Sequence, residues 1–343
     1  MGKNYYPVNN ETVIFQGRTF EQEGIRCFSW TDSGFTFNFE GTDVWAEIWT
    51  NQPHSEMSRP YLGVLLDGNT KPEEMYVFPI DREGWNSYSL AQSLPEGRHS
   101  VQLVKLSEAH HSIVKVKNLT VNGKLIESSL ANCACSIRAI EFIGDSITAG
   151  FGINCKTEDG PFYTKEQDGW RSYAALTARR LNARFYVIAH SGWGVYKSPY
   201  GERMPDIYEY TYDKGEYWDF LSNPVDLVVV NLGTNDSAWI SMDSEDNQEE
   251  NIRLFTDSYV DFIKKIRFYN PDAIILCVIG MMSVTTVPYI EQAVEIARSQ
   301  GISRVFFGQL PHAISYGAGH PSAESHLMAA DALEKMIREI TGW

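Results

Sequence analysis

The chain has 343 residues, 43% of them hydrophobic, and a formal net charge of −15 at pH 7. This length exceeds that of a typical single domain and favours two domains. The negative charge opposes contact with phosphate backbones and anionic membranes, which argues against a nucleic-acid-binding protein. Five cysteines, an odd number in a long chain, exclude a disulfide-stapled scaffold.

The sequence contains no apolar run of about eighteen residues, so it predicts no membrane-spanning helix. Its first ten residues, MGKNYYPVNN, include one lysine and lack the apolar segment of a signal peptide. As it stands, the sequence therefore predicts a cytoplasmic protein. A secreted chain whose leader had been removed would look the same.

Residues 10–130 show the two-residue period of β-strands. The segments FTFNFEG, VWAEIW, SVQLVKL and IVKVKNLTVNG alternate between apolar and polar side chains. Turn signals separate such segments at Asp67-Gly68-Asn69, Pro95-Glu96-Gly97 and Asn122-Gly123. Short alternating strands without a long helical run predict an antiparallel β-sandwich.

From about residue 139 the pattern changes to continuous apolar runs, namely AIEFIG, FYVIAHSG, DLVVVNLG, AIILCVIG and RVFFGQL. Strands of this kind are buried on both faces, as in a parallel sheet. Helical periods separate them at 169–181 and 249–269 and return near the C-terminus. The sequence therefore predicts a doubly wound α/β domain at 133–343 after a β-sandwich at 1–132.

Polar residues follow the apolar runs at the carboxyl ends of the predicted strands, where ligands bind in such sheets. Ser146 follows the first run, Gly192 ends the second and Asn235 follows the third, while His320 and His326 come after the last. The aperiodic segments 157–169 and 200–220 are expected to form loops at the same edge.

These residues supply the groups that acyl transfer needs. Ser146 suits the nucleophile and His320 the base, because an imidazole titrates near working pH. The backbone N–H groups of Ser146 and Gly192 and the side chain of Asn235 suit an oxyanion hole.

Each of these residues also has a structural interpretation. Ser146 could cap a helix, Asn235 could make an Asx turn and Gly192 could serve only a turn. His320 could be a loop histidine, and His326 is expected to pack in the last helix. A purely structural interpretation requires that four residues suited to acyl transfer follow successive strands by coincidence. The joint pattern therefore favours catalysis.

The blocks GDSITAG, SGWG, NLGTND and GHPS resemble the four sequence blocks of the SGNH (GDSL-like) hydrolases over roughly 139–343. The preceding β-sandwich and the GWG turn are similar to carbohydrate esterase family 2. That family comprises acetyl esterases of xylan and other acetylated sugars with an N-terminal jelly roll.

The resemblance implies a Ser146 nucleophile, a His320 base and an oxyanion hole formed by Ser146, Gly192 and Asn235, with Gly194 as the fallback for Gly192. It also implies that the enzyme needs no metal ion and no organic cofactor. The expected partner is an acetylated carbohydrate, and the sequence leaves the oligomeric state open.

The chain departs from the family pattern at Gly317, where most SGNH enzymes carry an aspartate three residues before the histidine. The resemblance to family 2 then implies a Ser146–His320 dyad in which a backbone carbonyl holds the imidazole. A carboxylate from elsewhere is the alternative, and Glu324 is the nearest in sequence.

Aromatic side chains beside the oxyanion blocks suit sugar rings, which makes Trp193 and Trp239 the candidate substrate-binding residues. Both could equally pack under loops. The sequence thus predicts an acetylxylan esterase-like enzyme acting on plant polysaccharides or oligosaccharides. A lipase, thioesterase or arylesterase with a longer acyl pocket and a non-catalytic carbohydrate-binding protein remain as alternatives.

Overall fold

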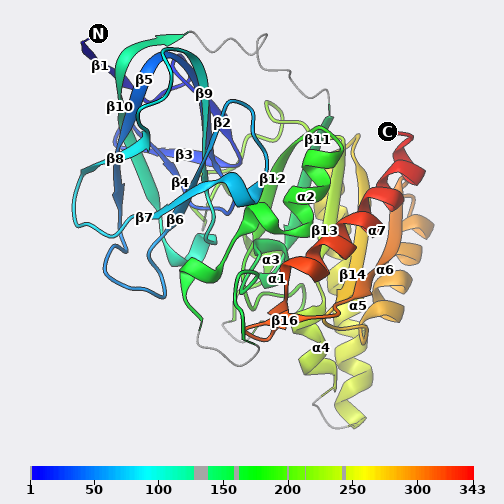
Figure 1. Ribbon diagram of the computed structural model, residues 1–343. Helices are drawn as coiled ribbons and strands as arrows, with labels where there is room; N and C mark the ends of the chain where they lie inside the picture. Colours follow the sequence, from blue (N-terminus) through cyan, green and yellow to red (C-terminus); the bar gives the residue numbers. More distant parts are fainter. Residues whose placement is uncertain (1, 127–137, 158–161, 199–200, 213, 242–244) are drawn as a thin grey trace.

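The computed structural model describes residues 2–126, 138–157, 162–198, 201–212, 214–241 and 245–343 (Figure 1). A β-stranded N-terminal domain lies beside an α/β domain that contains the rest of the chain. The predicted boundary between residues 132 and 133 lies outside the described residues.

The N-terminal domain consists of antiparallel strands. They are β1 (Lys3–Pro7), β2 (Ile14–Gln16), β3 (Thr19–Gln22), β4 (Ile25–Phe28), β5 (Gly34–Thr50), β6 (Tyr61–Leu66), β7 (Tyr76–Pro79), β8 (Asn86–Ala91), β9 (Gly97–Lys105) and β10 (Val114–Ile126). The main path of pairing is β3-β4-β10-β5-β9-β6-β7, with β1 on β10 and β2 and β8 on β5. Short 3₁₀ turns, η1 (Pro72–Glu74) and η2 (Ala109–His111), interrupt the loops. The predicted antiparallel β-domain is confirmed.

The long strand β5 changes partner half-way along its length. It pairs with β9 from Gly34 to Gly41 and with β8 from Val44 to Ile48. Odd-numbered side chains are buried in the first half and even-numbered ones in the second. The consecutive residues Asn122 and Gly123 of β10 pair with Asp43 and Gly41, so β5 carries one extra residue, Thr42, and this bulge produces the change of phase. At Gly41, where φ is +154°, a Cβ atom would collide with the carbonyl oxygen of Asn122.

The α/β domain has a five-stranded parallel sheet in the order β12-β11-β13-β14-β15. Its strands are β11 (Arg138–Gly144), β12 (Ala183–Ala189), β13 (Leu227–Asn231), β14 (Ile274–Met281) and β15 (Val305–His312). A short antiparallel hairpin, β16 (Tyr316–Gly317) and β17 (His320–Pro321), follows the last of them. All five predicted apolar runs are therefore strands of one parallel sheet.

Helices cover both faces of this sheet, which confirms the doubly wound prediction. They are α1 (Ser146–Ala149), α2 (Tyr173–Arg180), α3 (Met204–Ile207), α4 (Thr234–Ser241), α5 (Glu245–Tyr269), α6 (Val287–Ser299) and α7 (Ala323–Thr341), with 3₁₀ turns η3 (Thr164–Glu166) and η4 (Gly169–Arg171). Helices α2 and α7 pack together on one face and α5 and α6 on the other (Figure 1). Helix α6 was not predicted. Among the described residues, no helix has the length and apolar character needed to cross a membrane.

The two domains are joined by a buried ion pair. Arg18, between β2 and β3, donates through Nη2 to Oε1 of Glu141 in β11 at 2.8 Å. The same guanidinium donates to the carbonyl oxygens of Tyr208 and Tyr210, and the Tyr208 hydroxyl donates to Glu141. Neither charged side chain is more than 2% exposed. Because both charges have been removed from water, each depends on the other for compensation.

We expect Arg18→Met to lower the free energy of unfolding by about 3–5 kcal/mol, because it leaves the Glu141 carboxylate buried without its partner. Urea denaturation measures the loss, and Arg98→Met, on the exposed surface of the same domain, is the control. The double variant Arg18→Met/Glu141→Leu should recover much of the stability. A loss below about 1 kcal/mol in Arg18→Met, the range of an exposed pair, would contradict this account.

Candidate active site

The sheet brings the four predicted strand-end residues to one place. Ser146 follows β11, Gly192 follows β12, Asn235 lies at the start of α4 after β13, and His320 lies in β17. The Oγ atom of Ser146 lies 2.8 Å from Nε2 of His320. This end of the sheet, where α1 and β16 lie, is at the bottom of Figure 1. It is also the point where strand order reverses on either side of β11, which is the common ligand site of open α/β sheets.

Ser146 is the first residue of α1, and the helix cap is its neighbour. The carboxylate of Asp145 accepts a hydrogen bond from the Ile147 N–H at 3.0 Å, which is the N-cap interaction. The interpretation of Ser146 as a helix cap is therefore wrong, because Asp145 takes that role and leaves the serine hydroxyl free to face His320. Helix α1 ends after one turn at Gly150, which adopts a left-handed conformation.

The carbonyl group of Ala318 holds the His320 ring, since it lies 3.2 Å from Nδ1. A carbonyl oxygen only accepts, so Nδ1 carries the proton and Nε2 offers its lone pair to the Ser146 hydroxyl. Ala318 and Gly319 form the two-residue turn between β16 and β17 with φ values of 50° and 70°. Positive φ at both positions is typical of a type I′ hairpin turn, and this turn places the carbonyl beside the imidazole.

Packing explains why Gly317 replaces the usual aspartate. A Cβ atom at this position would lie 2.5 Å from the carbonyl oxygen of Cys155 and 2.8 Å from that of Gly152. Both neighbours are backbone atoms, so a side chain here requires the 152–155 segment to move. Glu324, the alternative orienting group, is exposed at the start of α7.

Two of the predicted oxyanion donors are backbone N–H groups. Within the described part of the chain, no residue accepts a hydrogen bond from the N–H of Ser146 or of Gly192. Gly192 has a φ of +79°, so the turn itself favours glycine. At Gly194, a Cβ atom would collide with the carboxylate of Asp236, which accepts three backbone N–H groups from the 195–197 segment. Gly194 thus has a packing role, and Gly192 remains the stronger donor candidate.

Asn235 uses its side-chain N–H groups within the protein. It donates to the carbonyl oxygen of Trp193 at 2.9 Å and to Oδ2 of Asp145 at 3.2 Å. Asn235 can serve an oxyanion only by releasing one of these bonds. The bond to Asp145 is the longer one, and burial raises the pKa of Asp145 to about 7, so this acceptor is partly protonated near neutral pH.

The two candidate substrate-binding tryptophans differ in their exposure to solvent. Trp193 is 4% exposed and stacks on His190, whereas Trp239 on α4 is 41% exposed. A cavity of about 180 Å³ lies beside Trp193 and His190, on the side of the N-terminal domain. His326 lies in the first turn of α7, the last helix. Its side chain is fully buried and Nδ1 accepts the Tyr173 N–H, which confirms the expectation that it packs inside the protein.

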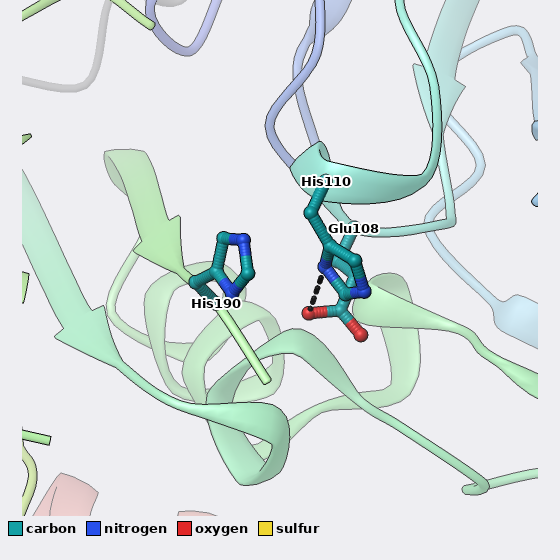
Figure 2. A group of neighbouring side chains, drawn as sticks. All are labelled: Glu108, His110 and His190. Atoms are coloured by element: carbon teal, nitrogen blue, oxygen red, sulfur yellow. Dashed lines mark ion pairs between the residues drawn. The ribbon is translucent and has the colours of Figure 1, made fainter. Parts of the chain in front are cut away.

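Sequence reasoning missed a cluster of polar side chains contributed by the N-terminal domain. Glu108 comes directly before η2, and His110 and His111 lie within it. The His110 ring stacks on His190 of the α/β domain, beside Glu108 (Figure 2). The Glu108 carboxylate also contacts Ser191, the residue before Gly192. The segment SEAHH was a visible signal, but it lies in the domain to which no chemistry had been assigned.

Glu108, His110 and His190 place one ligand atom each within 4.8 Å of one another, which raises the question of a metal site. The arrangement does not suit an ion. The rings of His110 and His190 stack with centroids 4.3 Å apart and planes inclined by 30°. An ion bound to both at about 2.0–2.1 Å must lie near both ring planes, and planes this close to parallel do not meet at that range.

Comparison with known proteins places these features in a family context. Residues 142–339 match the GDSL-like lipase/acylhydrolase family, and residues 15–128 match the carbohydrate esterase 2 N-terminal domain. Cellulase/esterase CelE of Acetivibrio thermocellus is 31% identical over 98% of this chain and 40% of its own length. The chain therefore spans less than half of that relative.

Two further similarities extend over most of both chains. An acetylxylan esterase / glucomannan deacetylase of Cellvibrio japonicus is 25% identical over 91% of this chain and 86% of its own. A family two carbohydrate esterase from Clostridium thermocellum, in complex with cellohexaose, is 29% identical with a TM-score of 0.84, covering 96% of this chain and 99% of its own. These findings confirm the resemblance drawn from the four sequence blocks.

We expect kcat/KM for an acetyl ester to rise with pH through a midpoint below about 6.5, the usual pKa of histidine. Burial lowers the pKa of His320, and the Ala318 carbonyl and the charge of Glu108 only partly oppose this shift. The ring must be neutral to accept the serine proton, so activity is lost as pH falls through the lowered pKa.

Glu324→Ala should change neither the midpoint nor the maximal rate by more than about twofold, because the exposed carboxylate does not hold the ring. Rates measured from pH 4 to 9 on both proteins test the point. A midpoint above 7, or a loss of several orders of magnitude in Glu324→Ala with the fold intact, would show that a carboxylate orients His320.

Proposed function

The chain belongs to the GDSL-like lipase/acylhydrolase family, and we propose that it is a serine esterase that removes O-acetyl groups from acetylated plant polysaccharides or oligosaccharides. One observation carries the proposal. The Ser146 hydroxyl lies 2.8 Å from a histidine nitrogen whose tautomer makes it an acceptor, and the predicted oxyanion donors Ser146 N–H and Gly192 N–H have no acceptor among the described residues.

In the first half of the reaction, Ser146 Oγ attacks the acetyl carbonyl carbon while its proton passes to Nε2 of His320. The oxygen of the tetrahedral intermediate accepts hydrogen bonds from the Ser146 and Gly192 N–H groups, and from Asn235 once it releases Asp145. Each such donor is worth about 3–4 kcal/mol in serine hydrolases. The intermediate collapses as His320 returns the proton to the departing sugar oxygen, which leaves an acetyl group on Ser146.

In the second half, water takes the place of the sugar hydroxyl. His320 removes a proton from the water as its oxygen attacks the acetyl carbonyl, and the same N–H groups hold the second tetrahedral intermediate. The proton on His320 then returns to Ser146 Oγ and acetic acid departs, which loses its remaining proton to solvent. Each step balances without any group beyond ester and water.

In this dyad the Ala318 carbonyl performs part of the role of the aspartate that the SGNH pattern predicts at position 317. It fixes the tautomer and the orientation of the ring. It carries no full charge, so it stabilises the imidazolium less than a carboxylate would. The buried, ionised Glu108 contributes a favourable charge to His320 from farther away.

The substrate class is supported by the relatives and by the aromatic side chains near the site. The relatives bear the names acetylxylan esterase, glucomannan deacetylase and cellulase/esterase, and one solved structure holds cellohexaose. The exposed indole of Trp239 lies one helical turn from Asn235 and presents a surface for a sugar ring. Trp193 is largely enclosed, so its contribution is restricted to the cavity that it lines.

We expect hydrolysis of 4-nitrophenyl acetate to exceed that of the octanoate by at least tenfold in kcat/KM, with the butyrate in between. Acetate release from acetylated xylan, glucomannan and cello-oligosaccharides identifies the natural substrate. Ser146→Ala should lower kcat by at least about 10³-fold, because it removes the nucleophile. Ser237→Ala, on the neighbouring helix α4, is the matched control.

A preference for octanoate would replace the acetyl esterase with a long-chain acylhydrolase. If the wild type and Ser146→Ala were equally inactive while acetylated xylan still bound, the chain would be a carbohydrate-binding protein.

A further inference from the structure

A loop of the N-terminal domain reaches the turn that carries the candidate oxyanion donor. Residues 106–112 follow β9, and Glu108 projects from this loop toward the segment that begins at His190, directly after β12 (Figure 2). The Glu108 side chain is completely buried. A buried carboxylate that comes from the other domain needs a structural or functional reason, because its removal from water is costly.

The carboxylate accepts hydrogen bonds from both polar groups of Ser191. Oε2 accepts the Ser191 backbone N–H at 2.7 Å, and Oε1 accepts the Ser191 hydroxyl at 2.6 Å. Oε1 also accepts a hydrogen bond from Nε2 of Gln167 at 2.8 Å. Charge-assisted bonds of this length are the stronger class of hydrogen bond in proteins.

Glu108 is itself held in position by its surroundings. Its backbone N–H donates to Oε1 of Gln167 at 3.1 Å, so the two residues are bonded reciprocally. The Lys105 ammonium donates to the carbonyl oxygens of Ser107 and Glu108 at 2.7 and 2.8 Å. The loop therefore has little freedom to move away from Ser191.

The bonding pattern requires the ionised form of Glu108. Burial by itself raises the pKa of this carboxyl, but hydrogen bonds and charge from His110 and His111 outweigh it and hold the pKa well below its usual value. Ser191 and Gln167 donate three hydrogen bonds to the two side-chain oxygens, and an acceptor-only carboxylate satisfies all three. An amide in the same place would present its own N–H group to a donor.

The two peptide groups on either side of Ser191 are both held. Glu108 accepts the Ser191 N–H of the first, and Nδ1 of His190 lies 3.1 Å from the Ser191 carbonyl oxygen of the second, which also contains the Gly192 N–H. The His190 ring is clamped between His110 and Trp193, with centroids 4.3 and 3.8 Å away. Burial lowers the pKa of His190 to about 4, so the ring stays neutral and Nδ1 keeps its single proton for the carbonyl.

We propose that Glu108 is a positioning residue for the oxyanion hole, through which the N-terminal domain fixes the direction of the Gly192 N–H. This inference rests on the proposed esterase function. It gives the N-terminal domain a part in catalysis, since the α/β domain alone lacks the acceptor for Ser191. Oxyanion donors act in the transition state, so the loss of positioning should appear in kcat rather than in KM.

The most conservative test variant is Glu108→Gln, which keeps the shape of the side chain and removes its charge. With 4-nitrophenyl acetate we expect kcat to fall at least tenfold and KM to change less than about threefold. Glu83→Gln, at an exposed position in the same domain, is the matched control and should resemble the wild type.

A second readout is the acid limb of kcat/KM. It should move to lower pH in Glu108→Gln, because the charge of Glu108 raises the pKa of His320 and a merely structural role would not move it. The titratable groups that face or sense Glu108 are Lys105, His110, His111, His190, Asp145 and His320. The limb is assigned to His320 by comparison with His110→Gln, whose midpoint should stay within about 0.3 pH units of the wild-type midpoint.

Hydrogen–deuterium exchange of the peptide that covers residues 190–196 tests the positioning without reference to activity. Faster exchange in Glu108→Gln supports the proposal, and unchanged exchange together with kcat within twofold of the wild type overturns it. An inactive wild type would defeat the proposed function, while the exchange result would still decide the positioning role. If Glu108→Gln does not fold, Ser191→Ala replaces it, and a kcat equal to that of the wild type would then overturn the proposal.

Discussion

The hydrogen bond between Ser146 and His320 joins residues that are 174 positions apart in the chain. Nothing local brings them together. The parallel sheet places the end of β11 and the loop that follows β15 at the same edge, with β13 and β14 between them, and the hairpin of β16 and β17 then brings His320 to Ser146. The buried apolar strands that build this sheet are therefore the physical condition for the 2.8 Å contact.

The same contact depends on a backbone group and not on a third side chain. Gly317 is packed against two carbonyl oxygens, so the position normally filled by aspartate has no room for one. The neighbouring turn compensates by directing the Ala318 carbonyl at Nδ1 of His320. The group that orients the His320 ring is therefore different from the group whose charge stabilises the imidazolium. Glu108, reaching in from the other domain, supplies negative charge at longer range.

Periodicity and strand-end chemistry predicted the two fold classes, the five parallel strands and the proximity of Ser146, Gly192, Asn235 and His320. These features follow from local patterns, because buried strands and their carboxyl-terminal residues are visible in sequence. The cap remained an alternative role for Ser146 in the sequence, since Asp and Ser cap equally well and only the geometry shows that Asp145 is the cap. Glu108 was missed because its role arises from a contact between the two domains, and the periodicity of apolar residues in the sequence does not reveal such contacts.

The most direct test of the account is to locate the acyl-enzyme. The protein is mixed with excess 4-nitrophenyl acetate, quenched in acid within the first turnovers and analysed by peptide mass spectrometry. The account predicts a single added acetyl group on the peptide that contains Ser146, absent in Ser146→Ala. Acetyl transfer to another residue, or ester hydrolysis that persists in Ser146→Ala without any acetylated peptide, would contradict it.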